Sequence, residues 1–598
     1  MPGPGRSDPR AAERAPARTG PDSHPAILRA AADGYTPRSP EQTLLHRIVR
    51  EQLETFLAHT RSRDQPAPRF VEQEFRAYLR CGVLAHGFLR MHCDECRLDR
   101  LVPFSCKRRG FCPSCGGRRM ADTAAHLVDC VLPEVPVRQW VLTLPYPLRY
   151  RCAYDSRLTS EVLRVFLRAL FAELRRRARH QWSVPRGQCG AVTFIQRFGS
   201  ALNANLHFHT LVLDGVYAST ERRPPRFLPL PPPSRHEVAR VLAGTARRIT
   251  RLLESRADGD DDALARDEPL LATLANASLR TRIASGPHAG ERWRRLGDRV
   301  EPQDTDADPE ASRRVPQHGG MSLHADVAVP APDRRRLERL CHYVARPPLA
   351  SDRLEERPDG RLTLRLKTRW RDGTTHILME PRELLERLVP LIPPPRAHQV
   401  RYHGVLAPCA SARDRIVPGP RPTPGPALGG PEPREPSAET IPASVGMGPA
   451  RPETPPHRLT DPAEPGASAS TGWPADLEPR ANDPPARGDP RAPDPRDPPP
   501  EVEVGRPRPQ RLAWAELLQR IFEVDALRCP RCGARMRLVA AIEEPAVARK
   551  ILEWLGLPAR APPLVPALHV SEEHEVESSG EGPPWAFDQT PPDADGTE

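Results

Sequence analysis

The chain has 598 residues, with 88 basic and 77 acidic side chains and a formal net charge of +11. Hydrophobic residues make up 38% of it and 76 residues are proline, so part of the chain is not expected to enter a packed core. No apolar run approaches the roughly 18 residues of a membrane-spanning helix, and residues 1–34 hold no apolar signal segment. We therefore expect a cytoplasmic protein that has no membrane partner and whose basic body binds a polyanion.

The N-terminal part predicts helices followed by a cysteine-rich segment. Residues 1–40 are rich in Pro, Arg and Ala without periodicity, which is typical of disorder. Apolar residues recur at helical spacing from Thr43 to His59. We assign residues 41–133 to a helical and zinc-binding domain that binds DNA.

Two CxxC motifs in this domain predict one structural zinc ion. Fifteen residues separate them, and at this spacing each loop can present two thiolates to one tetrahedral ion. The predicted ligands are Cys93, Cys96, Cys112 and Cys115. Cys106, His86 and His92 are near enough in sequence to replace one of them. Cys81 is interpreted as a buried thiol.

Six cations and no acidic residue occur between positions 100 and 119. Like charges in a small module repel one another unless a polyanion is bound, so the segment predicts a phosphate-binding surface for DNA. The alternative is a solvated face in an arginine-biased protein. The cations are Arg100, Lys107, Arg108, Arg109, Arg118 and Arg119.

Residues 134–410 alternate between strand-like runs and helices, which predicts an α+β domain. Candidate strands are Trp140–Leu144, Ala191–Phe198, His207–Val216 and Leu362–Trp370. Ser156–Arg179 carries a helical apolar stripe. The acidic run Ala257–Glu268 predicts a loop, and polar residues 303–320 predict a mobile insertion.

A histidine pair stands on one of these strands. Residues two apart on a strand share a face, so His207 and His209 project together while Phe208 points to the core. Two imidazoles are half of a site for a divalent ion. The alternative is a pair of ordinary hydrogen-bonded histidines. Gln196 and His324 are unranked candidates for a third ligand.

The segment Asp333–Arg346 predicts a helix that Asp333 caps and a Pro-Pro pair ends. Tyr343 lies on its polar side. A phenol among cations suits a nucleophile that attacks phosphate, because cations stabilise the phenolate and attract the substrate. The alternative is a boundary tyrosine with a hydrated hydroxyl. The cations on that side are Arg336, Arg339 and Arg346, together with His342.

The run Arg361–Arg371 alternates basic and apolar residues, which predicts a strand with one basic face. We expect this face to bind DNA, although it could simply be solvated. Its predicted DNA-binding residues include Arg365, Lys367, Arg369 and Arg371.

The C-terminal third divides into a linker, a small module and a tail. Residues 411–510 are proline-rich and predict a disordered linker. Residues 511–560 regain aliphatic spacing around Cys529 and Cys532, a single CxxC motif without further ligands nearby. This pair either binds zinc, with ligands from elsewhere or from another chain, or remains as two free thiols. Residues 561–598 form an acidic tail that we expect to be disordered.

In this order the motifs resemble those of bacterial rolling-circle insertion-sequence transposases, the HUH-type group with an N-terminal zinc-binding domain that includes common-region element transposases. The stretches that carry the resemblance are 105–115, 196–203, 207–216, 340–348, 370–376 and 401–406. It covers roughly residues 40–405, and weakly 512–557.

The resemblance implies an antiparallel-sheet HUH nuclease domain at 134–410. It implies that His207 and His209 bind catalytic Mg²⁺ or Mn²⁺ and that Tyr343 is the nucleophile. Arg339 and Pro347 stand four residues either side of Tyr343, so the chain is similar to the one-tyrosine subgroup. The implied reaction nicks and transfers a single DNA strand at an unpaired element end, through a 5′-phosphotyrosine. It needs no ATP, and the sequence holds no GxxxxGK[ST] phosphate loop.

Three other functions compete with this interpretation. A rolling-circle plasmid replication initiator or a relaxase would make the same cut but would transfer the strand to a different place. A non-catalytic, zinc-dependent DNA-binding protein would share only the zinc module. A metal hydrolase built on Asp214 is disfavoured, because that carboxylate is expected on the face opposite His209. The sequence leaves a homo-oligomer open.

Overall fold

A computed structural model describes residues 38–220, 223–256, 263–297, 315–370, 372–419, 516, 520, 525 and 527–568. The disorder predicted for residues 1–37, 420–510 and 569–598 lies outside these residues. Throughout the described part the strands pair antiparallel and helices pack between the sheets, which confirms the α+β class. No helix in these ranges is long and apolar enough to span a membrane.

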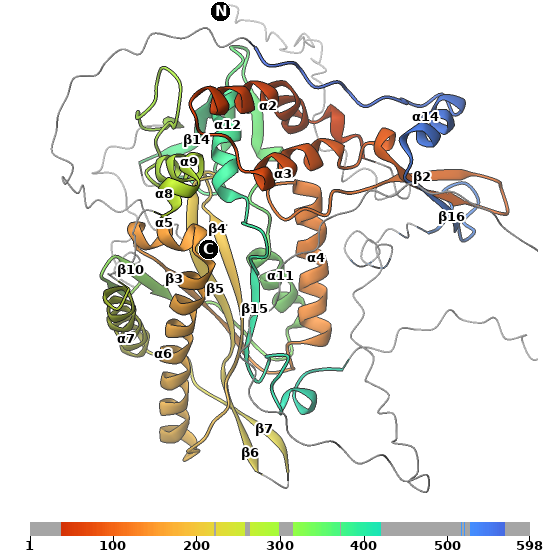
Figure 1. Ribbon diagram of the computed structural model, residues 1–598. Helices are drawn as coiled ribbons and strands as arrows, with labels where there is room; N and C mark the ends of the chain where they lie inside the picture. The colour runs from red at the N-terminus through yellow and green to blue at the C-terminus, as the bar shows by residue number, and fades with distance from the viewer. Residues whose placement is uncertain are drawn as a thin grey trace, which may run out of the picture. The chain divides into compact units, whose positions relative to one another are not determined.

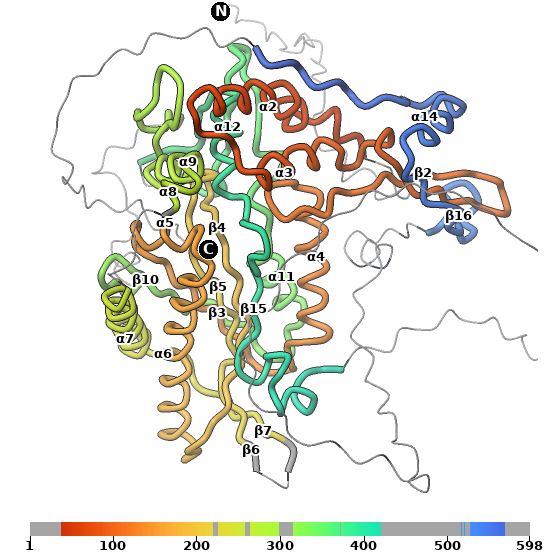
Figure 2. Tube along the Cα trace, in the orientation of Figure 1, coloured from red at the N-terminus to blue at the C-terminus, as the bar shows by residue number. Residues whose placement is uncertain are grey.

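The central sheet has the strand order β15-β4-β5-β3-β10-β9, with β11 also paired to β3. Every residue of β4 is buried, and β5 is nearly so, as expected for strands covered on both faces. Figures 1 and 2 show them as the long central strands. The bounds are β3 Val137–Thr143, β4 Gly190–Phe198, β5 Ala204–Leu213, β9 Gln317–His318, β10 Met321–His324, β11 Ala328–Val329 and β15 Val400–Gly404.

Different helices cover the two faces of this sheet (Figure 1). Phe208 and Val212 pack with α5 (Tyr146–Tyr154), α6 (Ser156–Trp182) and α7 (Arg235–Glu254). Leu211 and Phe194 pack with α4 (Pro113–Cys130) and α11 (Arg334–Val344) on the other face. Because strand residues alternate between faces, His207 and His209 belong to the face covered by α4 and α11.

A second core joins the N-terminal helices to a four-stranded sheet of order β12-β13-β14-β8. Helix α2 contacts both α12 and β12, so the N-terminal helices share one core with the middle of the chain. The bounds are α2 Leu44–Ser62, α3 Arg69–Arg80, α9 Pro269–Leu279, α12 Pro381–Leu388, β8 Arg294–Gly297, β12 Leu354–Glu356, β13 Leu362–Arg365 and β14 Thr374–Met379.

A three-stranded sheet joins the two ends of the chain. Strands β1 (Phe88–His92) and β2 (Asp99–Pro103) form a hairpin, and β16 (Arg537–Ile542) adds to β1 as its outer strand. The remaining elements are β6 Gly215–Thr220, β7 Arg223–Pro229, α8 Ala263–Asp267, α14 Pro545–Trp554, and the 3₁₀ turns η1 Pro40–Gln42, η2 Leu84–His86, η3 Ser351–Arg353, η4 Val389–Leu391 and η5 Arg413–Arg415.

Three predicted helices are confirmed, and so is the predicted cap Asp333. The predicted helix at 43–59 is α2, and the Thr43 hydroxyl accepts a hydrogen bond from the His46 amide. The predicted helix at 156–179 is α6, where Asp155 accepts two backbone N–H bonds. The tyrosine helix is α11, whose cap Asp333 accepts from the Arg336 amide. Each cap satisfies an N–H group that the first helical turn leaves unpaired.

Five predictions of local structure need correction. The predicted disordered linker begins too early, because residues 411–419 hold the 3₁₀ turn η5, with Ala412 and Ile416 buried. The basic strand ends at Arg365, because residues 366–370 turn back toward β14. The predicted acidic loop ends in the short helix α8, and residues 315–320 of the predicted mobile insertion form the β9–β10 turn. Residues 561–568 of the predicted disordered tail run along α2, where the Leu568 amide bonds the Thr55 hydroxyl at 3.2 Å.

Candidate active site and metal centres

The histidine pair occupies one face of the central sheet. In the β4–β5 register Gln196 stands opposite His207, and Phe194 stands opposite His209. His207 is 9% exposed and His209 is 2% exposed. The predicted strand geometry is therefore confirmed, and Phe208 faces the opposite core. Asp214 is bound to Arg138 through 2.8 and 2.9 Å contacts, so its carboxylate is engaged away from the imidazoles.

The two imidazoles point their Nε2 atoms at each other across 2.9 Å. An octahedral ion with ligands at about 2.1 Å sets neighbouring ligands about 3.0 Å apart, so this spacing suits two ligands of one cation. Burial lowers the pKa of His207 to about 4 and that of His209 well below its ordinary value. Both rings are thus neutral near pH 7, the form that binds metal.

A contact behind each ring orients its Nε2 atom. The Nδ1 atom of His207 lies 2.9 Å from the Asn205 carbonyl oxygen, to which it donates. The Nδ1 atom of His209 lies 2.7 Å from the side-chain amide of Gln139. Rotation of that amide exchanges its oxygen and nitrogen, and with the oxygen toward the ring Gln139 accepts the Nδ1–H. Contacts of this kind hold the metal-binding nitrogen unprotonated.

The two candidate third ligands stand in different surroundings. Gln196 is buried, its Nε2 donates to the Val344 carbonyl at 2.8 Å, and its Oε1 has no hydrogen-bond partner. His324 lies on β10, with its Nε2 3.2 Å from the Asp326 carboxylate. Among the His, Cys, Asp and Glu residues of the described ranges, only cysteine clusters show metal-site spacing. His324 therefore does not lie within such spacing of both imidazoles.

The tyrosine helix packs its polar edge against the histidine pair. The Tyr343 ring stands edge-on to His209, with centroids 5.9 Å apart and an interplanar angle of 86°. The Arg346 guanidinium lies 4.4 Å from the Tyr343 ring centroid. Its Nη1 is buried without a hydrogen-bond partner. A phenol, a cation with an unused donor and two imidazoles are the groups that a phosphoryl-transfer site uses.

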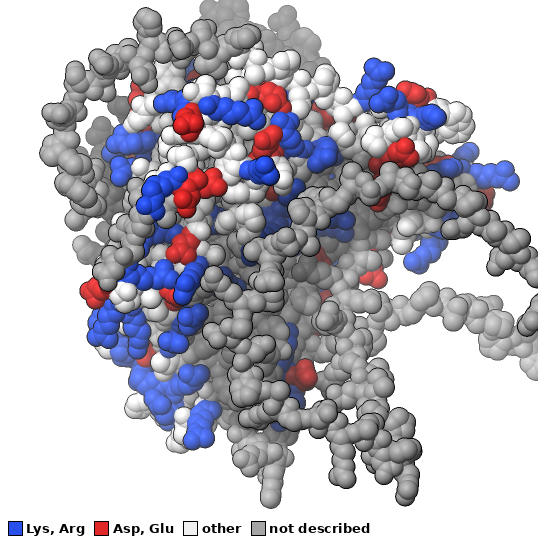
Figure 3. All heavy atoms as spheres, in the orientation of Figure 1, with Lys and Arg blue, Asp and Glu red and all other residues white. Residues whose placement is uncertain are grey.

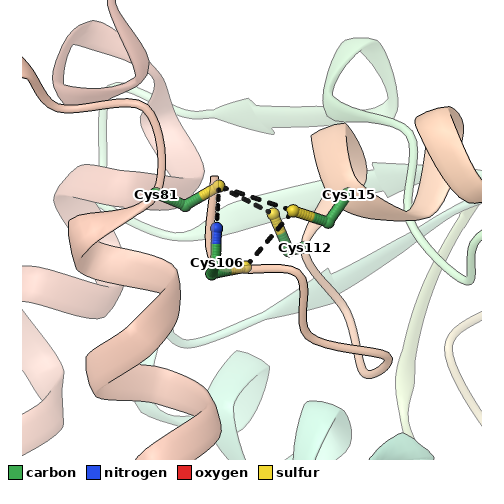
Figure 4. Close-up of side chains that lie close together, drawn as sticks. All are labelled: Cys81, Cys106, Cys112 and Cys115. Atoms are coloured by element: carbon green, nitrogen blue, oxygen red, sulfur yellow. Dashed lines mark hydrogen bonds between the residues drawn. The ribbon is translucent and has the colours of Figure 1, made fainter. Parts of the chain in front are cut away.

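One cysteine cluster lies where α3, α4 and a loop meet (Figure 4). Neighbouring sulfur atoms are 3.4–3.7 Å apart, and no disulfide forms among these residues. Four thiolates around zinc at 2.3 Å stand about 3.8 Å apart, so the cluster fits one zinc ion. Its members are Cys81, Cys106, Cys112 and Cys115.

The second cluster combines Cys93 and Cys96 with Cys529 and Cys532. The predicted grouping of both N-terminal CxxC motifs around one ion is therefore wrong. The β1–β2 hairpin carries the first motif away from the second, which begins α4. The first motif meets Cys529 and Cys532, more than 430 residues away, whereas the second meets Cys81 and the nearby Cys106. Cys81, interpreted as a buried thiol, belongs to a cluster, and the Cys529 pair finds its partners within its own chain.

Two family models match this chain. The transposase zinc-binding domain of IS91 type (Zn_Tnp_IS91) matches residues 48–144, and the transposase family Y2_Tnp matches residues 190–414. Together they span more than half of the sequence. The chain belongs to the IS91-like transposases. Neither a curated protein nor a solved structure matches it. The family and the cysteine clusters support structural zinc and DNA as the partner of this transposase.

The predicted DNA-binding cations of the transposase differ in the exposure of their side chains and in their bonds within the protein. Lys107, Arg118, Arg365, Lys367 and Arg369 are exposed, whereas Arg371 lies outside the described residues. Arg108 is half-buried, and Arg109 and Arg119 make hydrogen bonds within the protein. Arg109 donates to the Ala397 carbonyl at 2.7 Å, and Arg119 donates to the carbonyls of Lys107 and Arg108. Arg100 is 7% exposed.

A basic surface that the sequence reasoning missed follows α6 and α7. Figure 3 shows Lys and Arg gathered over this flank of the transposase, with few acids among them. Its exposed members include Arg164, Arg168, Arg179, Arg247 and Arg251. These arginines recur at helical spacing on the solvent side of two amphipathic helices, and this spacing is the sequence signal that could have indicated the surface. In an arginine-rich sequence that signal does not stand out.

The structure adds Gln139 and Cys81 to the residues of interest. Gln139 gives no sequence signal, because a glutamine in a strand has many uses and its partner His209 is 70 positions away. Cys81 is a lone cysteine in sequence. Its proximity to Cys106, Cys112 and Cys115 arises because the end of α3 packs beside the start of α4.

Proposed function

We propose that this transposase cuts one DNA strand by attack of the Tyr343 oxygen on a backbone phosphate, aided by a divalent cation at His207 and His209. The observation that carries the proposal is the position of the Tyr343 ring, whose centroid lies 5.9 Å from that of His209, one of the two histidines whose Nε2 atoms face each other. Gln196 Oε1 is the third protein ligand that we propose, because it is a buried, unpaired acceptor opposite His207.

The proposed reaction exchanges one phosphate ester for another. The Tyr343 oxygen bonds to phosphorus, the bond from phosphorus to the 3′-oxygen breaks, and the leaving oxygen takes up a proton that balances the one lost by the phenol. The products are a 5′-phosphotyrosine and a free 3′-OH. Because the number of phosphate ester bonds is unchanged, the later transfer of the DNA strand from Tyr343 needs no ATP. One tyrosine per helix limits each chain to one covalent DNA link at a time.

Protein side chains supply positioning and charge. Arg346 Nη1 is a buried, unused donor beside the phenol, placed to bind the scissile phosphate. Gln196 ties the end of α11 to β4 through the Val344 carbonyl, which fixes the tyrosine helix against the sheet. A Mg²⁺ or Mn²⁺ ion held by His207, His209 and Gln196 would polarise the phosphate. The exposed cations near β13 would hold the unpaired DNA strand.

A covalent-adduct assay tests this proposal. The purified protein is incubated with labelled single-stranded DNA of the element ends and Mn²⁺, and the DNA-linked peptide is identified by mass spectrometry. We expect the adduct on Tyr343. Tyr343→Phe and His207→Ala should lose the adduct while keeping DNA affinity, and Tyr35→Phe is the matched control. An adduct on another side chain, or an active Tyr343→Phe variant, overturns the mechanism.

The same variants separate the proposal from a protein that only binds DNA. A protein that only binds DNA forms no nicked or covalent product, so Tyr343→Phe and His207→Ala would leave the result of the assay unchanged. Excision and insertion of an element flanked by its own ends, measured in cells, distinguish the transposition route from a plasmid replication or relaxase route.

A further inference from the structure

The second cysteine cluster joins segments more than 430 residues apart. Cys93 Sγ lies 3.4 Å from Cys532 Sγ, and Cys96 Sγ lies 3.4 Å from Cys529 Sγ. All four sulfur atoms lie within 4.8 Å of one another. These separations fit a tetrahedral thiolate site, in which sulfurs stand about 3.8 Å apart. We propose that this cluster is a second structural zinc centre, which fastens the C-terminal segment of the chain to its N-terminal hairpin.

The two halves of the cluster have matching backbone turns. The Cys93 amide bonds the Leu98 carbonyl at 2.9 Å, and the Cys529 amide bonds the Ala534 carbonyl at 2.8 Å, five residues ahead in both cases. The residue after the second cysteine of each motif has a positive φ, +56° at Arg97 and +77° at Gly533. Two alike turns that face each other present their thiolates in pairs, as zinc knuckles do.

Contacts outside the sulfur atoms hold the same two segments together. Strand β16 pairs with β1 from Phe88↔Ile542 to His92↔Arg537. Ala548 and Leu552 of α14 are fully buried against Phe88. The Arg537 guanidinium binds the Asp94 carboxylate at 2.9 Å. These contacts bring the two cysteine pairs together from opposite ends of the chain.

The C-terminal segment also reaches the tyrosine helix. Arg520 binds Glu338 of α11 at 3.0 Å and also binds Asp129 of α4. A zinc ion at the second cluster would therefore anchor a C-terminal segment that contacts α11. This segment lies outside the residues that the two family models match. The second centre is also the more accessible one, because Cys532 is exposed and Cys96 is half-buried. We expect chelators to remove its zinc before that of the first cluster.

Metal counting on the full-length protein tests the proposal without any DNA reaction. We expect two zinc ions per chain in the wild type, one in the double variant Cys529→Ser/Cys532→Ser, and two in Cys409→Ser, an exposed cysteine outside both clusters. Substitution with Co²⁺ should give thiolate charge-transfer absorption that falls by half in the double variant. One zinc in the wild type, or two in the double variant, overturns the proposal.

A mixing experiment tests whether the centre forms within one chain. Cys93→Ser/Cys96→Ser chains are mixed with Cys529→Ser/Cys532→Ser chains, and zinc content and mass are measured by size-exclusion chromatography with light scattering. We expect the mixture to keep one zinc per chain and to gain no complex. Recovery of additional zinc in a mixed oligomer would show a centre shared between chains and would refute the intrachain fastening. Because neither assay uses nicking, their outcome is independent of the mechanism proposed for Tyr343.

Discussion

Replacement of Gln139 by leucine tests the role of the contact behind His209. Gln139 is 4% exposed and lies 2.7 Å from His209 Nδ1. Leucine has a similar size without a polar group, and the Gln139 backbone bond to Val327 does not depend on the side chain. The expected consequence is a His209 ring whose Nδ1 proton and orientation are no longer fixed.

The size of the effect follows from the kind of contact that is lost. Removing a partner that orients a metal-binding histidine weakens metal affinity or activity about 10–100-fold, which corresponds to about 1.4–2.7 kcal/mol. We expect Gln139→Leu to raise by that factor the Mn²⁺ concentration that gives half-maximal nicking. Gln139→Glu should restore most of the affinity, because a carboxylate also accepts the Nδ1–H.

The assay is a titration of DNA nicking against Mn²⁺ at fixed DNA concentration, with circular dichroism to confirm folding. Gln188→Leu is the matched control, since it makes the same change beside Tyr217. An orienting role for Gln139 is refuted if Gln139→Leu leaves the Mn²⁺ dependence unchanged, or if Gln139→Glu is as impaired as the leucine variant. Either result would mean that the amide packs beside His209 without orienting it.

Three further predictions concern stability, zinc and DNA affinity. Asp214→Asn weakens the buried pair with Arg138, and leaving a buried charge without its partner costs about 3–5 kcal/mol. We therefore expect a clear fall in Tm by calorimetry, and an unchanged Tm would contradict the pairing. Cys106→Ser removes one thiolate of the first cluster and should lower the zinc content by one ion, whereas Cys152→Ser should not. Lys367→Ala should lower the slope of log K against log salt for single-stranded DNA by about 0.7 if Lys367 contacts a phosphate, which fluorescence anisotropy measures; an unchanged slope would exclude that contact.

The groups of the proposed active site come from separate elements. Tyr343 comes from α11, His209 from β5, and Arg346 from the turn that follows α11. Gln196 connects them, since it bonds the end of α11 and stands opposite His207. A substitution at Gln196 should therefore disturb both the helix position and the cation site, which makes it less informative than Gln139 for separating the two effects.

The local structure around the site could be predicted from residue patterns within single elements. The alternation of His207, Phe208 and His209 fixed which side chains share a face, because strand geometry has a period of two. Asp333 predicted the start of the tyrosine helix, because its carboxylate accepts from an amide in the first turn. The order of these motifs also carried the resemblance to the transposase family.

Contacts between remote residues could not be predicted in the same way, because they depend on how the elements pack. The CxxC spacing predicted one zinc site, yet the hairpin and α4 separate the two motifs and give each one different partners. The third-ligand candidates could not be ranked until the β4–β5 register placed Gln196 opposite His207. Residue spacing along a chain constrains only neighbours within an element, whereas pairing across hundreds of residues depends on how strands and helices pack.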